Sequence, residues 1–138
     1  MRIVSRTTRM LLEQKRERSM RNRQAAGTLA GTAPRVERVR IQLRFLPVAG
    51  VVPAAQTHAL YPSAPAWFEF ACPFGDCDGS FDLNDTVKPL LSRSGPEASG
   101  SLQCGGTRTG SAPTRQPCNL RADYWIAAEY QAIERIAG

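Results

Sequence analysis

Four cysteines are the feature that most constrains how this 138-residue chain can fold. They are Cys72, Cys77, Cys104 and Cys118, and they form two pairs, C-x4-C and C-x13-C, separated by 26 residues. The chain also has eleven glycines and ten prolines, so much of it is expected to form turns and loops. Small, loop-rich domains usually need a cross-link or a metal to hold a modest core together. The cysteines are therefore expected to hold the fold together.

The residues around the cysteines favour tight turns. Pro73 restricts the backbone after the first cysteine, and Gly75 and Gly79 supply conformational freedom. Cys104 is followed directly by two further glycines. Turns of this kind let backbone amides point at sulfur and stabilise thiolates. Because structural zinc is held by four tetrahedral ligands, often all cysteine, the pattern predicts one zinc ion.

In this layout, residues 67–130 resemble the zinc-ribbon class, in which strands lead into glycine-containing turns that carry the ligands. The spacings here are wider than the usual two C-x2-C turns. The resemblance implies a structural Zn²⁺ bound by Cys72, Cys77, Cys104 and Cys118. It implies a small antiparallel sheet like that of a zinc ribbon. With the basic helix expected near the N-terminus, the predicted fold class is α+β.

Other interpretations of the cysteines stay open at this stage. Two structural disulfides would need an oxidising compartment, and unlinked or redox-active cysteines are a further alternative. The sole histidine, His58, is a candidate to replace one cysteine as a ligand, although a loop role is the simpler interpretation. The acidic residues around the first turn do not follow the order of a calcium-binding loop. We expect Asp76, Asp78, Asp82 and Asp85 to cap helices and form turns.

Positive charge is concentrated near the N-terminus. Residues 1–44 contain twelve Lys or Arg against three acids, whereas the remainder contains six against nine. We therefore divide the chain into a basic helical arm with its linker, 1–34, and a zinc-stabilised β domain, 35–138. A one-sided basic segment is typical of proteins that bind an anionic partner. The residues proposed to contact it are Arg9, Lys15, Arg16, Arg18, Arg21, Arg23, Arg38, Arg40 and Arg44.

Hydrophobic periodicity predicts the main elements. A helix is expected over 5–26, followed by an uncoupling linker over 25–34. Strict alternation predicts strands over 38–45 and 119–130, and shorter strands are expected over 67–72 and 102–104. A short helix is expected within 81–91, and the segments 46–66, 92–101 and 105–117 are expected to be irregular. Three arginines, Arg38, Arg40 and Arg44, share the polar face of the first strand and could extend the basic surface of the arm.

These observations favour a small non-catalytic protein that binds DNA or RNA through its basic arm. Catalysis is not expected, because the single histidine has no evident nucleophilic partner and no phosphate-binding loop is present. Five aromatic residues are candidates to stack on bases, although most are expected in the core: Trp67, Phe68, Phe70, Phe74 and Trp125.

The alternative is an accessory or adaptor subunit that docks on an acidic protein surface in a larger assembly. No apolar run approaches the roughly 20 residues of a membrane span. A cytoplasmic location is expected because no secretory signal is evident, with organellar import as a less favoured possibility.

Overall fold

Strand β1 (Val36–Phe45) lies at the centre of the fold in the computed structural model, which describes residues 6–46, 55–108 and 115–132. It pairs on one side with β2 (Ala55–Leu60) and on the other with β8 (Arg121–Tyr130). The edge strand β5 (Glu97–Gln103) completes an antiparallel sheet of order β2-β1-β8-β5. The predicted alternation is confirmed in both central strands. Residues 39, 41, 43 and 45 are buried in β1, and 120, 122, 126 and 128 are buried in or beside β8.

The edge strand β2 was not predicted, and only the end of β5 was. The expectation of irregular structure over 46–66 is wrong at β2. The strand expected over 102–104 is found as the end of β5, whereas the expectation of a loop over 92–101 is wrong at the rest of that strand.

In β2 the larger alternating residues include the polar Gln56 and His58, so the apolar alternation is weak. The strand β5 is rich in small residues and lacks the large alternating side chains that identify a strand. Gly100 shows why: a Cβ at this position would collide with the ring and hydroxyl of Tyr124, which lies opposite in β8. Part of the inward side of β5 is therefore covered by its neighbour.

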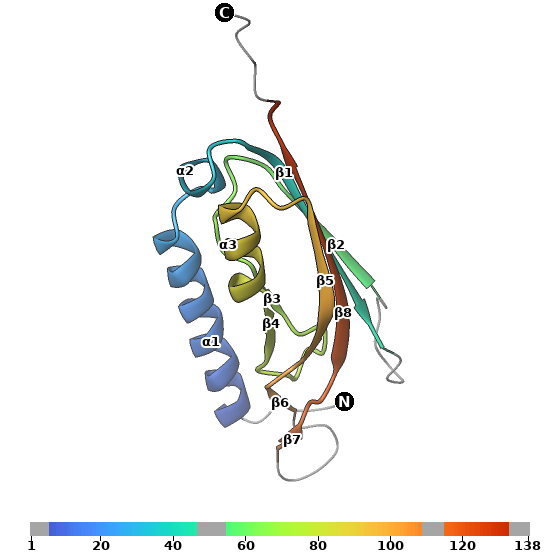
Figure 1. Ribbon diagram of the computed structural model, residues 1–138. Coiled ribbons are helices and arrows are strands. Elements are labelled where there is room, and N and C mark those ends of the chain that lie inside the picture. Colours follow the sequence, from blue (N-terminus) through green and yellow to red (C-terminus); the bar gives the residue numbers. More distant parts are fainter. Residues whose placement is uncertain (1–5, 47–54, 109–114, 133–138) are drawn as a thin grey trace, which may run out of the picture.

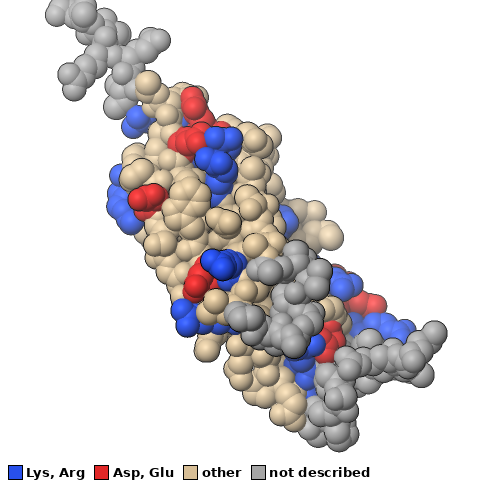
Figure 2. All heavy atoms as spheres, turned by 90° about the vertical axis from the view of Figure 1, so that its right-hand side faces the viewer, with Lys and Arg blue, Asp and Glu red and all other residues tan. Residues whose placement is uncertain are grey.

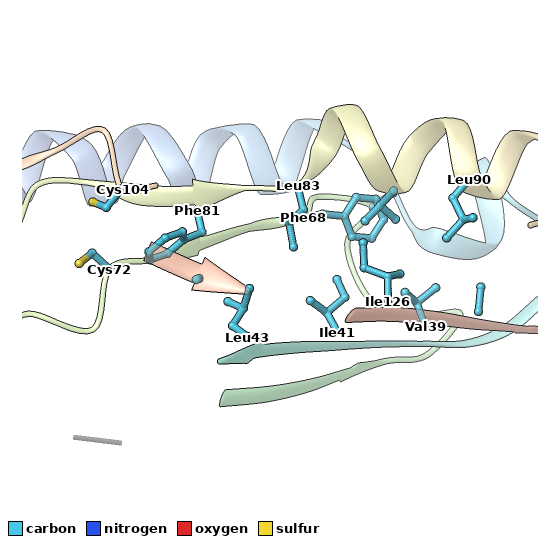
Figure 3. Packing of buried hydrophobic residues seen from close by; sticks show 14 of the residues in the cluster. Val39, Ile41, Leu43, Phe68, Cys72, Phe81, Leu83, Leu90, Cys104 and Ile126 are labelled. Atoms are coloured by element: carbon cyan, nitrogen blue, oxygen red, sulfur yellow. The ribbon is translucent and has the colours of Figure 1, made fainter. Parts of the chain in front are cut away.

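One face of the sheet is covered and the other is open (Figure 1). The covering layer contains the hairpin of β3 (Glu69–Ala71) and β4 (Ser80–Asp82), followed by α3 (Asn84–Ser92). The inward side chains of β1 and β8 meet those of this layer, and Cys72 and Cys104 lie at one end of the core (Figure 3). The labelled core residues are Val39, Ile41, Leu43, Phe68, Phe81, Leu83, Leu90 and Ile126.

The short helix was predicted over 81–91 and is found slightly later. Asp82 ends β4, and its carboxylate accepts a hydrogen bond of 2.9 Å from the backbone N–H of Asn84. Asn84 is buried, and its side-chain oxygen accepts a 3.0 Å hydrogen bond from the N–H of Phe68. Since a buried polar group costs free energy unless it is paired, this bond holds the start of α3 against the hairpin.

The predicted N-terminal helix is present as α1 (Arg6–Ala25). The next residues do not form the uncoupling linker expected over 25–34. They include the short helix α2 (Leu29–Thr32), and Leu29 is fully buried. Its N–H donates to the carbonyl of Ala64, and Ala66 donates back to Gly27. Small residues permit this close backbone approach, and a single leucine supplies the apolar anchor.

The fold is therefore mixed α/β, with a mainly antiparallel sheet and an N-terminal helix. No helix in the described ranges is both long enough and apolar enough to cross a membrane. The division of the chain at residues 34 and 35 stays a prediction. The contacts of Leu29 nevertheless join the residues before this boundary to those after it.

The burial of Leu29 yields a test with an internal control. Leu29→Ala should lower the free energy of unfolding by about 2–4 kcal/mol, because it leaves a cavity in the core. Leu11→Ala makes the same chemical change at a position that is 38% exposed, and should cost less than about 0.5 kcal/mol. Urea denaturation measures both. Equal effects would show that α2 does not anchor the N-terminal segment.

Candidate metal centre

The four cysteines come from two loops that meet at one end of the sheet. Cys72 and Cys77 lie in the connection between β3 and β4. Cys104 directly follows β5, and Cys118 directly follows β7 (Gln116–Pro117), which pairs with β6 (Thr107–Arg108). Every cysteine N–H donates to a backbone carbonyl, to Gly79, Phe74, Leu120 and Gly106 respectively. The backbone positions of all four side chains are therefore set by the surrounding turns.

The four sulfur atoms form a compact cluster within metal-binding distance. All lie within 4.8 Å of one another, with 3.8 Å between the Sγ atoms of Cys72 and Cys118 and 3.5 Å between those of Cys77 and Cys104. A tetrahedral zinc with Zn–S bonds of about 2.3 Å places its sulfurs about 3.8 Å apart. Three of the cysteines are buried and Cys118 is half-buried, and all four are free thiols in the structure. The site is therefore close to the size of a tetrathiolate centre.

The two loops contribute matching Cys-x-Gly turns. The N–H of Gly79 donates to the sulfur of Cys77 over 3.2 Å, and the N–H of Gly106 donates to the sulfur of Cys104 over 3.4 Å. This agrees with the expectation that turn amides point at sulfur. The two glycines also face each other so closely that a Cβ on either would collide with the backbone of the other.

Ionic contacts outside the sulfurs join the two loops. Asp76 forms a 2.9 Å ion pair with Arg108, whose guanidinium also lies 3.5 Å from the centre of the Phe74 ring. Asp78 accepts a 2.7 Å hydrogen bond from the N–H of Thr107 and lies 3.7 Å from Arg115. The sequence analysis did not identify these two arginines. The sequence shows aspartates near the first cysteine pair and arginines between the second pair. It does not show which arginine pairs with which aspartate.

The thiols influence one another's protonation. Hydrogen bonds from the thiols of Cys72 and Cys77 lower the pKa of Cys104, with a smaller contribution from the N–H of Gly106. The hydrogen bond with Cys104 is in turn the largest cause that raises the pKa of Cys72 and of Cys77. Like charges this close disfavour each other, so a cation is needed for all four sulfurs to ionise together.

The remaining candidates for a ligand role lie elsewhere. His58 is in β2 and stacks on Phe70 with ring centroids 4.2 Å apart. Burial lowers its pKa, and the charge of Arg23 adds to the effect. Among the described residues, the group that surrounds the possible metal position contains cysteines alone. Asp82 accepts a hydrogen bond at the start of α3, in line with the expected capping role, whereas the ion pairs of Asp76 and Asp78 were not expected.

The predicted basic residues do not form one surface. Arg38, Arg40 and Arg44 lie on the open face of the sheet, which Figure 2 shows with positive and negative side chains side by side. Glu129 accepts a 2.7 Å hydrogen bond from Arg38 and lies 3.6 Å from Arg40. The bond from Arg38 lowers the pKa of Glu129. This strand therefore does not extend the basic surface of α1, which lies on the covered side of the sheet (Figure 1).

The basic residues of α1 divide into two groups. Arg9, Arg16, Arg18 and Arg21 are exposed. Lys15 is half-buried, as are Leu12 and Ser19, which follow the same side of the helix. Ser19 donates a 3.3 Å hydrogen bond to the carboxylate of Glu69, and Arg23 donates to the carbonyl of the same residue. This side of α1 therefore faces the β3–β4 hairpin.

The candidate stacking aromatics are mostly internal. Phe68 and Phe74 are buried, and Trp67 and Phe70 are half-buried. Lys88 lies over the ring of Trp67, with its Nζ 5.0 Å from the ring centroid. Trp125 is 40% exposed and lies on the open face of the sheet, opposite Gln42 and Ser99.

The fold and the site together define a mixed α/β protein with a four-cysteine cluster of metal-binding dimensions. Comparison of the chain with protein-family models, with curated proteins and with solved structures finds no match. The inference of function therefore depends on the geometry of the site.

The close contact between Gly79 and Gly106 can be tested by comparing alanine substitutions at Gly106 and at its neighbour Gly105. Gly106→Ala should weaken metal binding by about tenfold or more and lower the melting temperature, because its Cβ would push the two loops apart. Gly105→Ala is the control, since a Cβ there has no atom within 4 Å. Metal competition with a chromogenic chelator and thermal unfolding measure the two effects. Equal behaviour of the two variants would show that the loops do not need this close approach.

Proposed function

We propose that this protein is a small non-catalytic zinc-binding protein, with one Zn²⁺ held by Cys72, Cys77, Cys104 and Cys118. The observation that carries the proposal is the mutual proximity of the four sulfur atoms, all within 4.8 Å. Sulfur-rich tetrahedral sites favour zinc or iron–sulfur chemistry over hard cations such as Mg²⁺ or Ca²⁺. The distances between the sulfur atoms are close to those around a single tetrahedral ion, which favours one zinc.

A structural role suits this centre better than a catalytic one. Catalytic zinc usually has three protein ligands and an open position for water, whereas four cysteines complete the coordination. The metal would join the β3–β4 loop to the segment between β5 and β8. These two parts are otherwise held together by Asp76–Arg108, by the contacts of Asp78 and by short backbone bridges.

We further propose that α1 binds a nucleic acid, DNA or RNA. The support is the charge of the helix, which carries seven Lys or Arg against two Glu, and the exposure of Arg9, Arg16, Arg18 and Arg21. Arginine pairs bidentately with phosphate and keeps its charge in all conditions of interest.

An adaptor role within a larger assembly is the second candidate, and the open face of the sheet favours it. Arg38 and Arg40 lie close to Glu129 on this face, Arg121 pairs with Asp123, and Trp125 is exposed between small and polar neighbours. Exposed tryptophan is enriched at the centre of protein interfaces.

Metal analysis tests the zinc centre directly. Protein purified without added metal should contain one zinc per chain by elemental analysis. Cys104→Ser should lower zinc affinity by more than about a hundredfold and unfold much of the domain, because ligand binding and folding are coupled. Ser101→Ala, at an exposed position in β5, the strand that Cys104 follows, should change neither. Absence of zinc, or a mass that shows two disulfides, would refute the proposal.

Nucleic-acid binding is tested by two double variants with the same change in net charge. Arg9→Gln with Arg21→Gln should weaken binding and reduce the slope of log affinity against log salt by up to about 1.8 on duplex DNA. Arg40→Gln with Arg44→Gln removes two charges from the open face of the sheet and should leave the slope unchanged. If only the second pair matters, the sheet face is the binding surface. If the wild-type protein shows no affinity, the adaptor role is favoured.

A further inference from the structure

The side of α1 that faces the domain lies over the cysteine centre. Two hollows, of about 470 and 420 Å³, separate the helix from the loops that carry the ligands. Cys72 and Cys77 line the larger hollow, and the paired glycines Gly79 and Gly106 line the smaller. Lys15 is the one α1 residue that lines both hollows, and it is half-buried. Lys15 therefore shares the larger hollow with Cys72 and Cys77.

Cations outnumber carboxylates around the two hollows. Four cations of α1 line them, namely Lys15, Arg16, Arg18 and Arg23. The carboxylates that line them are Glu69 and Asp78, and Asp78 also lies 3.7 Å from Arg115. One Zn²⁺ with four thiolates would carry two negative charges, which would attract this excess of positive charge.

The cations of the ligand loops are already engaged. Arg108 pairs with Asp76, and Arg115 lies near Asp78 while donating to the carbonyl of Thr107. Two hydrogen bonds of 3.3 Å, from Ser19 and Arg23, join the C-terminal half of α1 to Glu69 of the hairpin. Charge attraction to a metal–thiolate centre would add to these contacts.

We propose that the zinc–thiolate centre holds α1 against the domain by charge, with Lys15 as the positioning residue. This inference rests on the proposed zinc centre and adds a role for it beyond joining the two loops. The side of α1 that carries Lys15 then serves an intramolecular contact. The exposed arginines on the rest of the helix are the ones available to an external partner.

The test compares Lys15→Gln with Arg21→Gln, both in the zinc-loaded full chain. Both variants remove one positive charge from α1, but Arg21 is exposed and lines neither hollow. A protease that cleaves after arginine should cut at Arg16 and Arg18 about three- to tenfold faster in Lys15→Gln, because cleavage follows the undocked population. Zinc transfer to a chelator should accelerate similarly. Arg21→Gln should match the wild type, and Lys15→Arg should restore slow zinc transfer.

The outcomes distinguish a failure of the docking role from a failure of the proposed zinc centre. If Lys15→Gln keeps one zinc per chain but shows unchanged cleavage and zinc transfer, only the docking role of the centre is overturned. The docking role is likewise overturned if Arg21→Gln behaves like Lys15→Gln, since the effect would then be one of general helix charge. If the wild-type protein contains no zinc, the proposed centre fails and the docking role fails with it.

Discussion

The backbone contact between Gly79 and Gly106 is the constraint on which the rest of the structure depends. Each glycine follows a cysteine by two residues and directs its N–H at that sulfur. Because neither has a side chain, the two loops approach closely enough for four sulfurs to gather within 4.8 Å. Cys72 and Cys104 lie at one end of the core (Figure 3), where β5 ends and β8 begins. The positions of the four sulfur atoms therefore depend on the same backbone that pairs the strands.

Much of the centre of the fold could be predicted from the sequence because its signals are local. In β1 and β8, large apolar residues alternate with polar ones, so each strand by itself indicates which face of the sheet is buried. The cysteines and their glycines likewise indicated tight turns with amides directed at sulfur. The zinc-ribbon resemblance itself is a matter of layout, and no comparison with known proteins supports it.

The remaining features depend on tertiary contacts that no local pattern records. In β5, Gly100 occupies a position where the ring of Tyr124 fills the space that a side chain would take. The sequence of β5 alone therefore does not show an alternation of apolar and polar residues. The segment around Leu29 resembles a flexible linker until its hydrogen bonds to Pro62 and Ala64 are known. The roles of Arg108 and Arg115 depend on which aspartate each one meets across 30 or so residues of intervening chain.

The distribution of charge has consequences for any partner. In the sequence, the basic residues of the N-terminal third form one continuous group. In the structure, the sheet divides this group, because the arginines of β1 lie on its open face and α1 lies on its covered face. Glu129 offsets the charge of Arg38 and Arg40, whereas α1 presents several exposed arginines on one helix. A phosphate-rich partner would therefore meet the helix, and a protein partner would find paired charges and Trp125 on the sheet. The fold thus offers two chemically different surfaces on opposite sides of one small core.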